Sequence, residues 1–447
     1  RDAADRRADD PRGDLDARNA TRVIMSDRTL RTPTALNAAG LISGDVADDA
    51  RDVADRYAIA VTPEMADLIG RERAHDPATA LIDGPIARQF LPDPRELIRR
   101  VDERTDPIGD DAHSPVPHLV HRYRDRVLLK PISVCPVYCR FCFRREMVGP
   151  GKLPPARPAD LDRAYAYIAA DPNIWEVIIT GGDPLMLSPD RIRQINAALT
   201  AIPHVRIIRW HTRVPVVDTR RITLDLACAL AGPIDDGRMV YLAVHTNHAS
   251  ELTPAAATGI TRLRRAGISL ISQTVLLRGV NDTVAALATL MRRLVEVGVK
   301  PYYLHQLDRA PGTAHFEVPL AEARALVAGL RGDVSGLCQP TFVLDIPGGA
   351  GKTVAAAEAV ALTEPEDGGG WDGADMAFAT ATDRKGRAHR YAVDRAPLST
   401  GGVEAATTRG DTGAGRRGTS SGRCDGDATG GVAGGRELPN GGMDESA

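Results

Sequence analysis

The sequence is poor in lysine, in aromatic residues and in cysteine. Only five of its 56 basic residues are lysines, aromatic residues make up 4% of the 447 residues, and there are six cysteines. Because the formal net charge is only −3, we expect no electrostatic field that would attract nucleic acids. No apolar run reaches the roughly 18 residues that span a bilayer, so no membrane segment is expected.

Half of the cysteines are concentrated in one short segment. Cys135, Cys139 and Cys142 form a C-x3-C-x2-C group directly after the apolar run from Val127 to Val134. Three thiolates in one loop can hold three irons of a 4Fe–4S cluster and leave the fourth iron open. Zinc is the alternative metal, although a structural zinc site requires a fourth ligand; buried or disulfide-forming cysteines are the alternative without a metal. No secretory signal supports an oxidising compartment, so a reducing, cytoplasmic location is expected.

Strand and helix patterns alternate regularly from Val127 onward, starting with the apolar run that precedes the cysteine segment. Strands are predicted at Val127–Val134, Trp175–Thr180, Val205–His211, Met239–His245, Ile268–Leu276 and Pro301–Gln306, and a seventh apolar run at Thr341–Ile346. Helices are predicted at Pro158–Ala170, Pro189–Ala201, Thr223–Ala231, Pro254–Ala266, Thr283–Val297 and Leu320–Leu330. Six strand–helix units in succession predict an α/β fold with a parallel sheet.

The flanking regions have a different character. Residues 30–105 show helical spacing and are interpreted as a helical subdomain that contributes packing without chemistry. Residues 1–29 and 396–447 are poor in bulky apolar residues and are predicted to be disordered. Between the catalytic part and the tail, residues 366–395 are predicted to form a small extension with a hairpin around Lys385-Gly386.

Two further segments could carry chemistry. Residues 180–184, TGGDP, close the second predicted strand, where glycines admit a ligand and Asp183 can accept from an ammonium; a plain turn is the alternative. Lys352 follows a glycine-rich run, but a phosphate-binding loop needs glycine where Ile346 stands. Such a lysine can instead reach a bound aldehyde, as in enzymes that use pyridoxal phosphate, although composition alone favours a surface lysine.

Several segments between about Asp106 and Thr353 together resemble the lysine 2,3-aminomutase family of radical S-adenosylmethionine enzymes. They are HRYRDRVLL, CPVYCRFCFRR, ITGGDPLM, HTNHASE, SQTVLLRGVND, KPYYLHQLD and PTFVLDIPGGAGKT. The resemblance implies a (β/α)6 partial barrel of the TIM type over residues 106–365, with its active site at the carboxyl ends of the strands. It also implies a 4Fe–4S cluster on the three cysteines, S-adenosylmethionine, and pyridoxal phosphate bound to Lys352.

The resemblance also assigns cofactor-binding residues. Gly181, Gly182 and Asp183 would bind the amino group of S-adenosylmethionine. Arg213 would help to hold the same cofactor, with a structural role as the alternative. The pocket for pyridoxal phosphate would be lined by two residues of this chain, Arg122 and Gln273.

Three residues would select the substrate. Arg144 matches the arginine that binds the carboxylate of the amino acid, and its guanidinium fork suits that group. Asp308 and Asp345 match the two acids that hold the side-chain ammonium of lysine. Two converging buried carboxylates are costly without a cation, so such a site would select one.

The implied activity is that of an L-lysine 2,3-aminomutase, which moves nitrogen from carbon 2 to carbon 3 by radical chemistry and yields β-lysine. The alternatives are a relative that makes β-lysine for modification of elongation factor P, an arginine 2,3-aminomutase, and a non-catalytic iron–sulfur protein. The presence of Asp345 argues against the relative that serves elongation factor P. The non-catalytic protein is disfavoured because Lys352, Asp183 and Arg144 are all present. The family's zinc-binding cysteine is replaced by Thr283, so no zinc is expected; a homo-oligomer and an electron donor such as flavodoxin or ferredoxin are expected.

Overall fold

The computed structural model describes five parts of the chain. They are residues 28–75, 83–356, 360–362, 378–382 and 388–392. The tail predicted at 396–447 and nearly all of the N-terminal extension predicted at 1–29 lie outside these residues, as does most of the extension predicted at 366–395.

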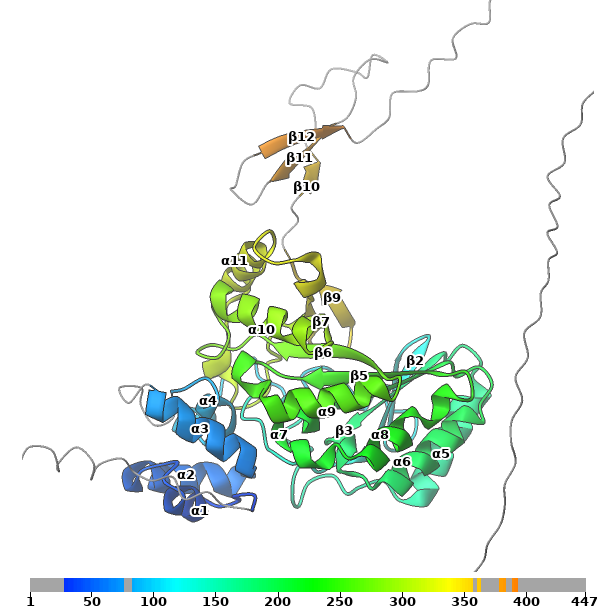
Figure 1. Ribbon diagram of the computed structural model, residues 1–447, viewed down its shortest axis with the longest axis horizontal. Coiled ribbons are helices and arrows are strands. Elements are labelled where there is room, and N and C mark those ends of the chain that lie inside the picture. Colours follow the sequence, from blue (N-terminus) through cyan, green and yellow to red (C-terminus); the bar gives the residue numbers. More distant parts are fainter. Residues whose placement is uncertain (1–27, 76–82, 357–359, 363–377, 383–387, 393–447) are drawn as a thin grey trace, which may run out of the picture. The chain divides into compact units, whose positions relative to one another are not determined.

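A nine-stranded sheet forms the centre of the fold, and its strands follow the order of the chain (Figure 1). The strands are β1 (Leu119–Tyr123), β2 (Arg126–Ile132), β3 (Glu176–Gly181), β4 (Ile207–Thr212), β5 (Met239–His245), β6 (Ser269–Val275), β7 (Lys300–His305), β8 (Thr341–Ile346) and β9 (Gly351–Val354). The seven strands from β2 to β8 pair in parallel, whereas β1 and β9 pair antiparallel at the two edges. The predicted parallel α/β barrel is therefore confirmed, with an antiparallel strand added at each edge.

Helices connect the parallel strands. They are α5 (Pro158–Ala170), α6 (Pro189–Thr200), α8 (Leu224–Ala231), α9 (Pro254–Arg265), α10 (Val284–Glu296) and α11 (Leu320–Leu330). Four of them, α6, α8, α9 and α10, begin after a Ser or Thr whose side chain accepts a backbone N–H of the first turn. Figure 1 shows α5, α6, α8 and α9 along one side of the strands, where their apolar faces cover the sheet.

Two edge strands differ from the sequence prediction. Tyr123 ends β1, which lies before the first predicted strand, in a segment for which no strand was predicted. Lys352 lies in β9, not in a loop as its glycine-rich surroundings suggested. The Tyr123 hydroxyl accepts the Lys352 backbone N–H at 2.7 Å, so the two edges of the sheet meet at this point. This contact nearly closes the barrel.

The helical part contains α1 (Pro33–Ala38), α2 (Gly44–Arg56), α3 (Pro63–His75), α4 (Ala87–Phe90) and a 3-10 turn at Pro94–Leu97. From that turn, the buried Glu96 accepts from Arg140 Nε at 2.8 Å and Nη2 at 2.5 Å, and forms an ion pair with Arg145. Both arginines belong to the cysteine loop. The helical part therefore holds that loop in place, which goes beyond the packing role expected from the sequence.

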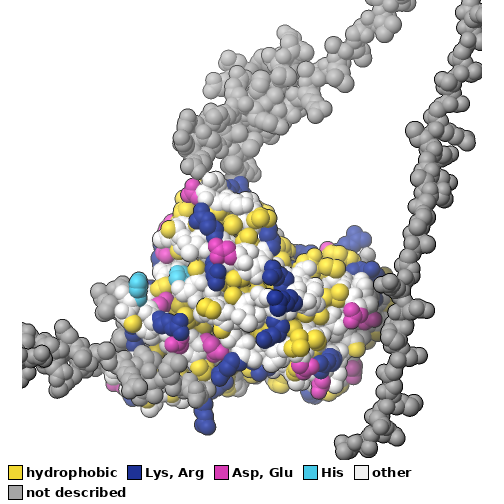
Figure 2. Space-filling model, viewed as in Figure 1, with side chains coloured by type: hydrophobic (Ala, Val, Ile, Leu, Met, Phe, Trp, Pro, Cys, Tyr) yellow, Lys and Arg dark blue, Asp and Glu magenta, His cyan; other side chains and the backbone are white. Residues whose placement is uncertain are grey.

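A second sheet and the molecular surface complete the description. β10 (Val360–Leu362), β11 (Phe378–Thr382) and β12 (Ala388–Ala392) form a three-stranded antiparallel sheet. The turn predicted around Lys385-Gly386 lies outside the described residues, between β11 and β12. Figure 2 shows acidic and basic side chains interspersed over the visible face. None of the described helices is long and apolar enough to cross a membrane.

Candidate active site

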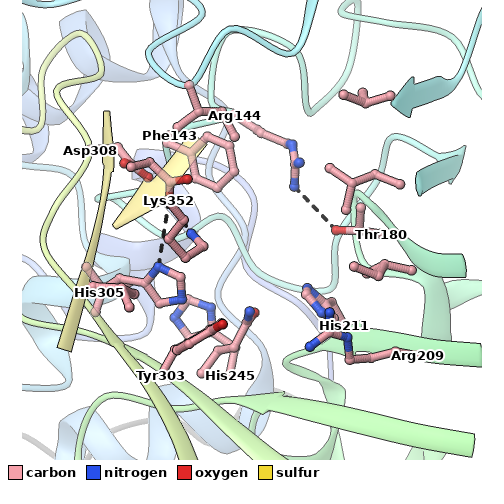
Figure 3. A pocket seen from close by; sticks show the side chains of 18 of the residues that line it. Phe143, Arg144, Thr180, Arg209, His211, His245, Tyr303, His305, Asp308 and Lys352 are labelled. Carbon is pink, nitrogen blue, oxygen red and sulfur yellow. Dashed lines mark hydrogen bonds and ion pairs between the residues drawn. The ribbon is translucent and has the colours of Figure 1, made fainter. Parts of the chain in front are cut away.

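All thirteen predicted site residues line one cavity of about 680 Å³ inside the barrel. They are Cys135, Cys139, Cys142, Arg122, Gln273, Gly181, Gly182, Asp183, Arg213, Arg144, Asp308, Asp345 and Lys352. Many of them lie at or just after the carboxyl ends of parallel strands, the usual place for catalytic residues in barrels of this kind. In Figure 3, Lys352, Asp308 and His305 lie on one side of the cavity, and Thr180 and His211 lie on the other.

The two glycines at the end of β3 allow another part of the backbone to approach. Gly181 has a φ of +109°, and a Cβ there would lie 2.5 Å from the Ile132 carbonyl oxygen. A Cβ on Gly182 would lie 2.6 Å from the Val134 nitrogen. The Gly182 N–H also donates to the Ile132 carbonyl at 2.7 Å. The glycines thus admit the chain that enters the cysteine loop, whereas the sequence analysis gave this space to a ligand.

Asp183 uses its carboxylate to fix the turn after β3. One oxygen accepts from Thr212 Oγ1 at 2.6 Å and Leu185 N at 3.0 Å. The other accepts from Arg213 N at 2.7 Å and Val214 N at 3.2 Å. These four bonds occupy about as many positions as a carboxylate offers. The predicted contact of this side chain with an ammonium stays a prediction.

The three thiols suit a metal cluster in their chemistry. Burial raises the pKa of Cys135, and it raises that of Cys142 to about 11, so both thiols need a nearby cation to ionise. Arg213 Nη1 donates to Cys139 Sγ at 2.8 Å. Among the described residues, no group of three or more His, Cys, Asp or Glu side chains could hold a single metal ion. In a 4Fe–4S cluster each thiolate binds a different iron.

A buried carboxylate that the sequence analysis missed organises the arginines. Asp110 Oδ1 accepts from Arg122 Nη2 at 2.9 Å, and its Oδ2 accepts from Arg144 Nη2 at 3.1 Å. Lys130 Nζ lies 3.9 Å from the same Oδ2. Burial alone would raise the pKa of Asp110, but Arg144, Lys130 and Arg122 together hold it below its ordinary value. The only signal in the sequence was its position within the segment from Asp106 that precedes β1.

Arg122 and Arg144 keep further hydrogen-bonding capacity. The Nε atom of each is buried without a hydrogen-bond partner, and both side chains line the cavity. Arg144 also donates from Nη1 to Thr180 Oγ1 at 3.3 Å (Figure 3). Unpaired guanidinium donors in a buried site are costly, so this side of the cavity suits an anionic ligand such as a phosphate or a carboxylate.

The opposite side of the cavity carries two acids and one amine. Asp345 on β8 is the direct antiparallel neighbour of Lys352 on β9, so their side chains share a face and form an ion pair. Burial and the Asp345 charge raise the pKa of Asp308 to about 7. His305 Nδ1 lies 4.0 Å from Asp345 Oδ2, but burial and Lys352 lower its pKa well below the ordinary value, which keeps the imidazole neutral. Two carboxyl groups around one amine give this side of the cavity the chemistry to hold a cation.

Comparisons with known proteins agree with this arrangement. A family model described as "Radical SAM superfamily" matches residues 129–291. The L-lysine 2,3-aminomutase of Clostridium subterminale is 40% identical over 297 residues, which cover 66% of this chain and 68% of that protein. The chain belongs to the lysine 2,3-aminomutase family. The proteins of the same name from Fusobacterium nucleatum and Escherichia coli K12 are 43% and 39% identical; the matches cover 60% and 61% of this chain and 62% and 78% of theirs.

Membership of the lysine 2,3-aminomutase family makes the protein an isomerase of the aminomutase type. The radical S-adenosylmethionine family implies a 4Fe–4S cluster and S-adenosylmethionine. Among solved structures, a radical SAM methyltransferase from Sphaerobacter thermophilus has a TM-score of 0.35 and 19% identity, covering 51% of this chain and 68% of that one. A similarity this low bears on neither substrate nor mechanism.

Proposed function

We propose that the protein is an L-lysine 2,3-aminomutase that converts L-lysine to β-lysine with a 4Fe–4S cluster, S-adenosylmethionine and pyridoxal phosphate. The observation that carries the proposal is the position of the Lys352 amine, which faces the cavity that the three cysteines also line. Names of the relatives support the same reaction.

The cluster end of the cavity fits the first two cofactors. Cys135, Cys139 and Cys142 would each hold one iron, while the segment Gly181, Gly182 and Asp183 would bind the ammonium of S-adenosylmethionine. Bound together, these groups would supply a carbon-centred radical able to remove a hydrogen atom from the substrate. The walls of the barrel would keep water away from that radical.

Residues at the other end fit pyridoxal phosphate. The Lys352 amine can bind its aldehyde, and the unpaired Nε donor of Arg122 supports a phosphate nearby. When bound, the cofactor's ring would delocalise an unpaired electron next to the migrating nitrogen. Gln273 lines the same cavity, and its role toward this cofactor is part of the proposal.

Substrate selection would use both charged sides of the cavity. Arg144 would bind the carboxylate of lysine through its guanidinium. Asp308 and Asp345 would hold the side-chain ammonium of lysine. In this structure the Lys352 amine forms an ion pair with Asp345. Once that amine is bound to an aldehyde, the two acids need another cation, which the substrate brings. The electron donor and the homo-oligomer remain predictions.

The activity can be tested directly. Protein reconstituted with iron and sulfide without oxygen receives pyridoxal phosphate, S-adenosylmethionine and dithionite, and then lysine, arginine, ornithine or glutamate in separate reactions. We expect a β-amino acid from lysine. Arginine is the second arm, because a guanidinium also suits two carboxylates. Product from glutamate alone would contradict the assignment of Asp308 and Asp345.

The role of Lys352 has its own test. Lys352→Ala should lose the visible absorbance of bound pyridoxal phosphate and the activity. Lys300→Ala is the matched control, because Lys300 is exposed at the start of β7 and donates only to backbone carbonyls. Retention of the absorbance in Lys352→Ala would show that another amine binds the cofactor.

A further inference from the structure

Asp110 lies between Arg122 and Arg144, the two arginines on the side of the cavity that suits an anionic ligand. Its side chain is fully buried, and it bonds Arg122 with one oxygen and Arg144 with the other. The carboxylate therefore bridges the two guanidinium groups, which fixes their separation and orientation. Among the described residues, no other carboxylate forms an ion pair with Arg122 or Arg144.

Three cations surround this carboxylate. Arg122, Arg144 and Lys130 all lie within 4 Å of one Asp110 oxygen or the other. Asp106 and Asp111 add negative charge near Lys130, but Asp110 is the carboxylate that forms an ion pair with all three cations. Without the carboxylate, mutual repulsion would drive the three cations apart, and their placement would no longer be defined.

The segment that carries Asp110 also touches the chain in front of Lys352. Gly109 has a φ of +68°, and a Cβ there would lie 2.7 Å from both the nitrogen and the Cα of Gly349. The Gly348 N–H donates to the Pro107 carbonyl at 3.4 Å. Asp110 is thus held at a fixed place relative to the strand that presents the Lys352 amine.

We propose that Asp110 is a positioning residue that gives the substrate's α-carboxylate its subsite by holding Arg144 beside Arg122. The inference rests on the proposed function, since it takes the substrate to be an amino acid whose carboxylate binds Arg144. Asp110 itself touches no substrate. It acts by fixing where the guanidinium donors point, at a set distance from the amine of Lys352.

The test compares two ligands that differ only in the carboxylate. Lysine and cadaverine, which is lysine without its carboxylate, are titrated into the protein loaded with pyridoxal phosphate, and the change in visible absorbance gives each dissociation constant. The ratio of the cadaverine constant to the lysine constant measures the carboxylate subsite. This ratio is compared in the wild type, Asp110→Asn, Asp110→Glu and the control Asp111→Asn, which changes an exposed neighbour.

We expect Asp110→Asn to lower the ratio by about 30-fold, because disrupting a buried charge pair costs at least roughly 2 kcal/mol. Asp110→Glu keeps the charge but displaces it by one methylene, so its ratio should lie between the ratios of the wild type and of Asp110→Asn. Asp111→Asn should keep the wild-type ratio. If Asp110 only supported the fold, both ligands would weaken equally and the ratio would not change, which would overturn the inference.

Failure of the inference differs from failure of the proposed function. A wild-type ratio near one would mean that no carboxylate subsite exists, which overturns both the role of Arg144 and the inference. A high wild-type ratio that Asp110→Glu and Asp110→Asn both retain overturns the inference alone. Should Asp110→Asn not fold, an unchanged ratio in Asp110→Glu is sufficient to overturn it.

Discussion

The raised pKa of Asp308 predicts that lysine binding weakens below neutral pH. With a pKa of about 7, this carboxyl is mostly protonated at pH 6 and mostly ionised at pH 8. An ammonium binds the ionised form, so lysine affinity should fall about tenfold from pH 8 to pH 6. Lys352 lowers this pKa while its amine is free.

The raised pKa of Asp308 also affects the free energy of unfolding of the protein without substrate. The folded pKa of Asp308 lies above the unfolded value of about 3.9, so folding disfavours the ionised form. The cost is absent below about pH 4, grows between the unfolded and the folded pKa, and levels off above pH 7 at about 4 kcal/mol. Asp308→Asn should remove this cost, which chemical denaturation at pH 5 and pH 8 would measure.

Absorbance titrations of lysine between pH 6 and pH 8 test the binding prediction. The wild type should lose affinity as the pH falls, and Asp308→Asn should bind weakly with little pH dependence. Norleucine, which lacks the side-chain ammonium, is the matched ligand and should show no such dependence in the wild type. Constant lysine affinity over this range would refute the reasoning, because Asp308 would then not exchange a proton near neutrality.

Three further substitutions test the scaffold. Gly182→Ala should displace Val134 at the start of the cysteine loop, costing about 1–3 kcal/mol and lowering the iron bound per protein after reconstitution; full iron content would contradict the close approach. Tyr123→Phe leaves the Lys352 N–H without its partner and should cost about 1–3 kcal/mol in chemical denaturation; unchanged stability would contradict a structural role of this hydrogen bond. Glu96→Gln breaks a buried ion-pair group and should cost about 3–5 kcal/mol in the same assay; a change below 1 kcal/mol would mean that its arginines are solvated.

The parallel sheet and its helices could be predicted from the sequence because their signals are local. Strands buried on both faces appear as continuous apolar runs, and four of the six helices between them begin at Ser or Thr caps. The edge strands β1 and β9 could not be found in this way. They are short and polar, as in Gly351–Val354, and they form only because a neighbouring strand is available.

The site was predictable as a set of residues but only partly as a set of contacts. The resemblance named side chains that do line one cavity. It could not reveal that Asp183 accepts three backbone N–H groups and the Thr212 hydroxyl, or that the loop entering Cys135 fills the space above Gly182. Asp110 was missed because a buried acid has no sequence pattern of its own. Its importance depends on which cations the fold brings to it.

The hydrogen bond between Tyr123 and Lys352 joins residues 229 positions apart in the chain. A ribosome would therefore have to release nearly the whole barrel before the two edge strands could meet. Until then the amine of residue 352 lacks the cavity that the full barrel forms around it. An aldehyde captured in that pocket would report that synthesis had passed β9, and shorter chains would stay unloaded.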